Sequence, residues 1–497
     1  RDEHVYFWFP LLAGLSELTF DPRQEIRASA LEVLFDTLMH HGGSFAASFW
    51  KRVFYSVLLP IFDHVRAEVT DTTTFTSEKR RQQEDSWLYE TCTRCLQHLV
   101  DVFVQFYEET KQLLPQLLDL LLGFMNRSHQ SLAAVGVAAF VRLVNSAATR
   151  MDSNAWATVT NFLMTSTQEI CPSAYDLAGV QLLLVQGCSD IYSKQYSCMP
   201  PAALCKVLQT LELIASHARG IDMDLDLRKR LAMQQAEDRV AEDRIVADPP
   251  LLRLEMEASH AYLSVLLHLM TLANTRDGAR LHAASNPGPC MVQLCMAILS
   301  RFALGSAGNG VRPDAAYMAE AATRLQQLQA SQQAAAEKAA VDAVASAGLS
   351  TVFAGVSGRT AAQQRAMAAK MSAVACAAQG KTPDQKSLIV GRTSAGVPVL
   401  MATPAVEYAP FAPLVGSALK ALGGLDDASF KGHLPQFFPL MTSLIQTDYA
   451  PPEVLRVLSD LFAKRVGPII GVMNATAAME AAVSARQERK SSDGRQQ

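Results

Sequence analysis

Apolar side chains recur along most of the chain at intervals of three and four residues, which is the spacing of one face of an α-helix. The clearest stripe spans residues 132–144, where the helical period continues without a gap. Two small residues on this stripe, Gly136 and Ala139, predict close approach by a neighbouring helix. Few segments alternate with period two, so the pattern predicts an all-α fold with minimal strand content.

Residues that favour the start and the end of a helix flank the first well-defined helix. We expect Asp21 as its N-cap and Pro22 at its first helical position, with Gly42-Gly43 at its end. A second helix is expected at 49–62, with Pro60 ending or bending it. The polar stretch 70–85 is predicted to be a loop. Further helices are expected at 87–107, 113–124, 132–144, 177–192, 203–219, 251–272 and 290–304.

Two parts of the chain that lie 106 residues apart share a similar pattern, which we call the internal echo. Ile26 corresponds to Leu132, and Trp50 corresponds to Trp156. Each copy consists of a helix, a loop and a helix that carries Trp-x-x-Val. Residues 21–34 also resemble the second helix of a HEAT repeat. These observations predict HEAT/armadillo-like helical repeats stacked as an α-solenoid, and the alternative is an ordinary helical domain with chance similarity.

Composition changes along the chain divide it into expected regions. Ala and Gln dominate from about residue 305, without large apolar residues in a helical stripe, which is typical of a low-complexity insertion with little core of its own. The packed pattern returns after about residue 408. The predicted regions are HEAT-like helices at 1–66, helical repeats at 83–300, the insertion at 301–407, a C-terminal helical region at 408–474 and a disordered tail at 475–497.

Overall composition excludes several classes of protein. The chain has 497 residues, of which 49% are hydrophobic and 19% charged, so it can bury a sizeable core. The formal net charge of −4 argues against a general nucleic-acid binder. Nine cysteines are too sparse for a disulfide framework and fit a reducing compartment. No apolar run reaches about 18 residues, so no membrane span is expected. Because the sequence begins at Arg1, we expect it to be a fragment.

Cysteine and histidine residues offer no convincing metal site. Cys92-x-x-Cys95 with His98 lacks a second pair of ligands, and both cysteines lie on an apolar stripe, which favours core packing. His40-His41 are expected to complement a helix C-terminus. His260 and His268 are two turns apart without acidic or Cys partners at ligand spacing, so core or boundary positions are favoured.

Charged and glycine-containing motifs are equally weak. Gly380-Lys381-Thr382 resembles the end of a phosphate-binding loop but lacks its first glycine, so a nucleotide-binding enzyme is disfavoured. Asp222, Asp224 and Asp226 lack the rest of a calcium loop, which favours a solvated face. The basic runs 79–81 and 228–230 are interpreted as solvated, with anionic lipid as the alternative. We therefore predict no catalytic, cofactor-binding or metal-binding residues.

Long blocks of the sequence resemble one family in its own order. They are 8–38, 49–63, 86–107, 129–144, 248–270 and 411–445. Together they are similar to the region downstream of the catalytic domain in the large brefeldin-A-inhibited exchange factors for Arf GTPases. The resemblance covers about 1–300 and 408–470, whereas 301–407 departs from it.

The resemblance implies a regulatory and non-catalytic role. The family's exchange activity lies in a separate helical domain, which no segment here resembles, so no catalytic residue is carried over. The implied partners are small GTPases of the Arf and Rab families, the protein's own N-terminal catalytic region and a second copy in a homodimer. The implied location is cytoplasmic and peripheral on trans-Golgi membranes, without nucleic acid or cofactors. The alternative is a generic HEAT-repeat adaptor or transport scaffold.

Overall fold

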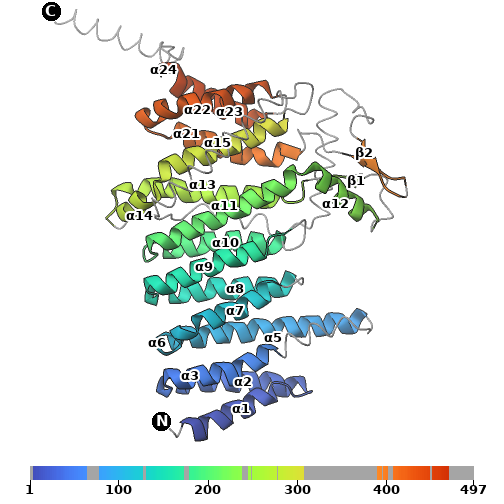
Figure 1. Ribbon diagram of the computed structural model, residues 1–497, viewed down its shortest axis with the longest axis vertical. Helices are drawn as coiled ribbons and strands as arrows, with labels where there is room; N and C mark the ends of the chain where they lie inside the picture. Colours follow the sequence, from blue (N-terminus) through green and yellow to red (C-terminus); the bar gives the residue numbers. More distant parts are fainter. Residues whose placement is uncertain are drawn as a thin grey trace, which may run out of the picture.

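The structure is a computed structural model, and its helices stack one above another along the long axis, from the N-terminal α1 at the bottom to the C-terminal α24 at the top (Figure 1). The structure describes residues 4–63, 78–126, 130–172, 178–237, 245–247, 249–276, 278–306, 389–394, 396–400, 407–447 and 450–469. The described residues are almost entirely helical, so the prediction of an all-α solenoid is confirmed.

The lower half of the solenoid consists of helices between residues 4 and 223. They are η1 His4–Trp8, α1 Phe9–Leu18, α2 Gln24–His41, η2 Gly42–Ser44, α3 Ala47–Val53, η3 Phe54–Leu58, α5 Glu78–Gln105, α6 Tyr107–Thr110, η4 Lys111–Leu113, α7 Leu114–Met125, α8 Gln130–Ala147, η5 Ala148–Arg150, α9 Ser153–Glu169, α10 Ala178–Gln195 and α11 Pro201–Met223.

The upper half contains the remaining helices and three short strands. They are α12 Leu225–Glu237, β1 Ile245–Val246, α13 Leu252–Thr271, η6 Leu272–Asn274, α14 Gly278–Ser285, α15 Pro287–Ser306, β2 Ile389–Arg392, β3 Pro398–Leu400, η7 Ala409–Phe411, α21 Ala412–Gly423, α22 Asp427–Gln446, α23 Pro452–Leu461, η8 Phe462–Val466 and α24 Gly467–Ile469.

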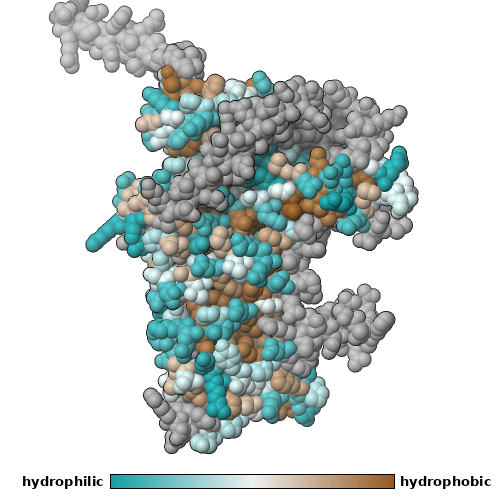
Figure 2. All heavy atoms as spheres, in the orientation of Figure 1, coloured by the Kyte–Doolittle hydropathy of each residue, from teal (hydrophilic) through white to brown (hydrophobic). Residues whose placement is uncertain are grey.

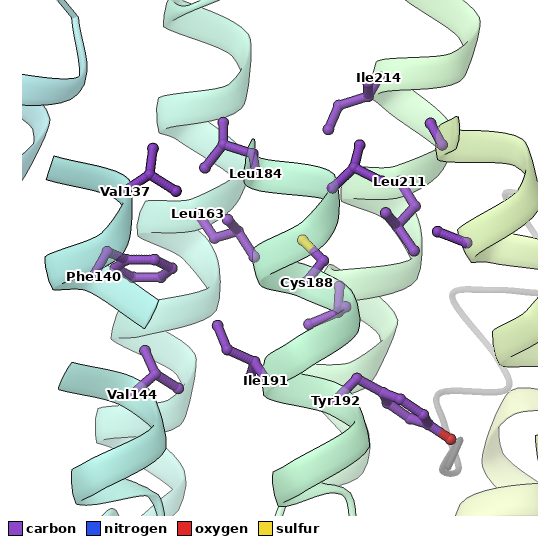
Figure 3. Packing of buried hydrophobic residues seen from close by; sticks show 14 of the residues in the cluster. Val137, Phe140, Val144, Leu163, Leu184, Cys188, Ile191, Tyr192, Leu211 and Ile214 are labelled. Atoms are coloured by element: carbon purple, nitrogen blue, oxygen red, sulfur yellow. The ribbon is translucent and has the colours of Figure 1, made fainter. Parts of the chain in front are cut away.

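Two rows of helices share one continuous core. In one row α2 packs on α5, α5 on α8, α8 on α10, α10 on α13 and α13 on α15, while in the other α7 packs on α9 and α9 on α11. Figure 3 shows the joint at mid-height, where Phe140 of α8, Leu163 of α9 and Ile191 of α10 point toward one another. Their apolar side chains are almost completely excluded from water, and this burial is the main source of the solenoid's stability.

The internal echo is a true structural repeat. The helix α2 and the helix α8 begin at Gln24 and Gln130 and end at His41 and Ala147, an offset of 106 residues at both ends. The same offset separates the 3₁₀ turns η2 and η5 and the first residues of α3 and α9. The corresponding Trp50 and Trp156 are each 1% exposed. The repeat interpretation is therefore confirmed in preference to chance similarity.

Two local predictions differ from the structure, and at Pro60 one of two predicted alternatives is excluded. The N-cap of α2 is Arg23 instead of Asp21, because the Asp21 carboxylate accepts hydrogen bonds from the Arg23 backbone and guanidinium in the turn before the helix. Helix α5 begins at Glu78, within the predicted loop 70–85, since the residues 78–85 favour helix although they lack an apolar stripe. Pro60 does not end its helix, which continues to Asp63; the π-turn η3 lies just before it, and there the N–H of Leu59 bonds to the carbonyl of Phe54.

The solenoid continues across the predicted insertion. Helix α15 ends at Ser306 and packs directly on α21, which begins at Ala412. The loop-closure entropy rises only slowly with loop length, so a long excursion between two stacked helices is tolerated. Within 301–407 the structure describes the end of α15, the strands β2 and β3, and Glu407. The division into regions stays a prediction, and the predicted tail 475–497 lies outside the described residues.

A small sheet lies beside the solenoid, next to the projecting helix α12 (Figure 1). Its strand order is β1-β3-β2, with β1 parallel and β2 antiparallel to β3. Two of its strands come from the end of the predicted insertion.

Candidate functional site

A cluster of mostly buried charged and polar side chains occupies the joint between α11, α12, α13, α15 and the chain entering η7. We call it the junction cluster, and its members are Arg219, Asp222, Arg228, Glu255, Arg301, Glu407 and Tyr408. The exposed fractions of Asp222, Arg228 and Glu255 are 1%, 4% and 0%. Burial of a charge costs several kcal/mol unless it is paired, so the pairing in this cluster decides whether the joint is stable.

Glu255 of α13 is held between two arginines. Its Oε1 accepts a hydrogen bond from Nε of Arg219 at 3.1 Å, and its Oε2 accepts one from Nε of Arg301 at 3.3 Å. Arg301 also donates from Nη1 to the hydroxyl of Tyr408 at 2.6 Å, and its guanidinium lies 5.1 Å from the centre of the Tyr408 ring. These contacts connect α11, α13 and α15 to the segment that follows the predicted insertion.

Arg228 of α12 forms the second part of the cluster. Its Nη1 and Nη2 donate to Oε1 and Oε2 of Glu407 at 3.2 and 2.9 Å, a two-pronged ion pair. Nη2 also donates to the carbonyl of Ala247 at 2.8 Å, and Nη1 to the carbonyl of Asp222 at 3.5 Å. One side chain therefore joins four separate segments of the chain.

Asp222 is the member with the most unusual protonation. Burial raises its pKa to about 7; the Leu251 N–H, which donates to Oδ1 at 2.8 Å, opposes that rise. The charge of Glu255 raises the pKa further, whereas Arg301 and Arg228 lower it. Oδ2 is buried without a hydrogen-bond partner among the described residues. Asp222 can thus take up or release a proton near neutral pH, but no nucleophile stands beside it in the cluster.

The structure corrects the solvated-face interpretation of two charged runs. Asp224 and Asp226 are exposed as expected, but Asp222 is buried. In the basic run 228–230, Arg228 points inward to Glu407, while Arg230 is exposed and Lys229 pairs with Asp226. The side chains of 79–81 lie outside the described residues.

Sequence reasoning missed the junction cluster because its partners are far apart in the chain. Arg228 and Glu407 are separated by 179 residues, and Arg301 and Tyr408 by 107. The local signal was weak: in α12, which mixes apolar and charged residues, Ala232 lies one helical turn after Arg228 and is 5% exposed.

The cysteine motif belongs to the core. Cys92 and Cys95 are 0% and 1% exposed, and burial raises the pKa of the Cys95 thiol far above its usual range. A thiol with such a pKa stays protonated and is a poor metal ligand. His98 is exposed and stacks on Phe35 with 5.2 Å between ring centres. The core interpretation of Cys92 and Cys95 is confirmed by their burial.

The histidines are placed largely as expected. His40 and His41 lie in the last turn of α2, where Nδ1 of His40 is 2.7 Å from the carbonyl of Asp36. Nδ1 of His268 is 3.2 Å from the hydroxyl of Tyr192, and burial lowers the pKa of His268 to about 4. Burial also lowers the pKa of His260, whose Nδ1 has no hydrogen-bond partner among the described residues.

No group of three or more His, Cys, Asp and Glu side chains in the described part of the chain could hold a metal ion. The motif Gly380-Lys381-Thr382 lies outside the described residues, so the structure does not place it.

One helix meets the length and composition of a membrane span. Residues Ser131–Arg150 have a mean hydropathy of 1.6, which qualifies the expectation that no such segment exists. This is weak evidence for a span, because 61% of the window is buried inside the solenoid and a core helix passes the same test. Its helix α8 packs on α5, α7 and α10.

The outer surface offers apolar areas for partners. Figure 2 shows apolar residues along the middle of the solenoid, bordered by hydrophilic ones, and a further apolar area on α12. On and beside α12, Met223, Leu225 and Met233 are 56%, 49% and 38% exposed. Such surfaces suit protein partners, since flexible Met side chains adapt to different shapes.

Comparison with known proteins shows which families and proteins the chain is similar to. Two family models match: the BIG2 C-terminal domain at 179–352 and 401–463, and the GBF1-like tetratrico peptide repeat region at 8–139. The chain is also similar to brefeldin A-inhibited guanine nucleotide-exchange protein 2 of Arabidopsis thaliana, with 29% identity over 95% of this chain and 25% of the relative. This chain is a homologue of the brefeldin A-inhibited exchange proteins. The resemblance noted in the sequence is thereby confirmed.

The chain is also similar to other relatives. Brefeldin A-inhibited guanine nucleotide-exchange protein 3 of Arabidopsis thaliana is 28% identical over 94% of this chain and 24% of its own length. The Arf exchange factor sec71 of Schizosaccharomyces pombe is 27% identical over 28% of this chain and 8% of its own length. The segment thus spans about a quarter of the length of the first two relatives. Neither family description names a catalytic domain, and no solved structure matches.

Proposed function

We propose that this chain is a regulatory, non-catalytic scaffold of an Arf guanine-nucleotide exchange factor in trans-Golgi vesicle trafficking. Its partners in this proposal are small GTPases of the Arf and Rab families and the catalytic half of its own protein. The observation that carries the proposal is homology over 95% of the chain to a protein named as an exchange factor.

The architecture fits such a role. A solenoid presents long surfaces on which a globular partner can contact several repeats at once. The buried cysteines and the paired charges of the junction cluster fit a binding function. The proposed site of action is the cytoplasmic face of trans-Golgi membranes, with peripheral attachment and homodimerisation as further parts of the proposal.

The first experiment is capture of Arf- and Rab-family GTPases by this chain, each GTPase being locked in its GTP or GDP state. We expect preferential capture of a GTP form and no acceleration of nucleotide release by the chain alone. The nucleotide state itself is the matched control, because the two forms share one sequence. Deletion of this region from the full protein should change exchange rate or membrane recruitment, and unchanged values of both would refute the proposal.

A second candidate is a generic HEAT-repeat adaptor without exchange-factor partners. It is favoured by a relative whose name mentions no exchange activity, the protein MON2 homolog of Caenorhabditis briggsae, which is 29% identical over 21% of this chain and 7% of its own length. Failure to capture any GTPase, together with normal exchange after deletion, would favour this adaptor function.

A further inference from the structure

We propose that the Arg228–Glu407 ion pair is a conformational lock, which fastens α12 and the small sheet to the solenoid as one detachable unit. We call this unit, residues 225–237, 245–247, 389–394 and 396–400, the side module. The proposal goes beyond the proposed function and does not depend on it, because it concerns how two parts of the chain are joined.

The side module has little hydrophobic core. Its buried apolar cluster consists of Ala232, Ala247 and Val399, packed with Val397, and is separate from the main core of the solenoid. Hydrophobic stabilisation grows with the apolar area buried, so two alanines and one valine supply little of it. Something other than apolar packing must therefore hold the module in place.

The ion pair supplies the missing attachment. Arg228 and Glu407 are joined by two hydrogen bonds of 3.2 and 2.9 Å, and their side chains are 4% and 6% exposed. Glu407 is followed directly by Tyr408, which is bound to Arg301 of α15 in the main solenoid. Arg228 also donates to the carbonyl of Ala247, next to β1. The pair therefore connects the module, through Glu407 and Tyr408, to the stacked helices.

Detachment need not disturb the repeats. The contacts α11–α13, α13–α15 and α15–α21 form the solenoid beside the module, and none of them includes α12 or a strand. Glu255 stays paired with Arg219 and Arg301 if Arg228 moves away. The scaffold then has two states, docked and detached, and a partner that prefers one state shifts the balance between them.

The test is native-state hydrogen exchange of the full 497-residue chain, with Glu407→Gln as the variant. This change leaves Arg228 buried beside a neutral amide. Removal of one partner from a buried pair typically changes an opening equilibrium by two or more powers of ten, so we expect roughly 100-fold faster exchange in α12, β1 and β3. Exchange in α8 and α10 should stay as in the unchanged protein.

Two further variants make the result specific. Asp101→Asn breaks the exposed pair with Arg142, whose side chains are 39% and 48% exposed, and should leave exchange in α12 unchanged. The double variant Arg228→Met with Glu407→Leu replaces the pair by apolar groups and should restore much of the protection.

Two outcomes would overturn the proposal. Exchange in α12 that is unaffected by Glu407→Gln would show that the pair does not fasten the module. Equal acceleration in α12, α11 and α13 would show that the module is no separate unit. If Glu407→Gln does not fold, hydrogen exchange of the unchanged protein in increasing urea tests the proposal instead. The side module must then open at a lower urea concentration than α13, and simultaneous opening contradicts the lock.

Discussion

Gly136 of α8 faces Met125 of α7 at a distance that excludes a side chain. A Cβ at Gly136 would lie 2.9 Å from Cγ and 3.0 Å from the backbone nitrogen of Met125, and 3.0 Å from Cβ of Phe124. The close approach of α7 and α8 predicted from this small residue is therefore present.

Gly136→Ala should destabilise the chain despite the better helix propensity of alanine. The backbone of Met125 cannot move without shifting α7, and overpacking of this kind costs about 1–3 kcal/mol. Gly220→Ala in α11 is the matched control, because no atom lies within 4 Å of its Cβ position, and it should stabilise by up to about 1 kcal/mol. Thermal unfolding followed by tryptophan fluorescence compares the two, and a midpoint for Gly136→Ala at or above the unchanged protein would contradict the packing described here.

Phe140→Asp should unfold the middle of the solenoid. Phe140 is 1% exposed and packs on Phe162 with 5.4 Å between ring centres, so an aspartate there loses the core contact and buries an unpaired charge. We expect a loss of about 4 kcal/mol or more. Val33→Asp in the equivalent repeat is the control, because Val33 is 49% exposed. Circular dichroism and the unfolding midpoint should fall only for Phe140→Asp.

Glu255→Gln should weaken the joint between the lower and upper repeats. The change leaves Arg219 and Arg301 without their shared carboxylate, which typically costs about 3–5 kcal/mol in a buried site. Disruption of the exposed Arg142–Asp101 pair by Asp101→Asn should cost about 1 kcal/mol or less. The two urea unfolding midpoints should differ accordingly, and equal midpoints would show that Glu255 is better solvated than its 0% exposure indicates.

Local patterns predicted the solenoid because helical stripes depend on neighbouring residues. The offset between Trp50 and Trp156 was readable in the same way, since each lies in a complete helix–turn–helix unit. The junction cluster could not be predicted from local patterns, because the burial of Arg228 depends on Glu407, which lies 179 residues further along the chain. The prediction that Asp21 is the N-cap of α2 failed for a different reason. The Asp21 carboxylate binds Arg23 instead of capping the helix, and this contact lowers its pKa to about 2.

Asp222 should give the chain a stability that falls between about pH 4 and pH 7. Its pKa in the folded chain is about 7, against the ordinary 3.8, so the folded state holds a proton that the unfolded state has lost in this range. The stabilisation is complete below the ordinary pKa and is lost as pH rises through the folded pKa, by at most about 1.4 kcal/mol per pH unit. His268, with a folded pKa of about 4, has the opposite effect: its stabilisation is lost as pH falls below about 6.5.

Urea unfolding of the chain and of Asp222→Asn, at pH 5 and pH 8, separates the effect of Asp222 from that of His268. Asparagine cannot ionise, so the difference in stability between the two proteins should change by about 2 kcal/mol or more from pH 5 to pH 8 in the direction that favours the unchanged chain at pH 5. A pH-independent difference would place the Asp222 pKa near its ordinary value, and with it the charged form of Asp222 inside the junction cluster.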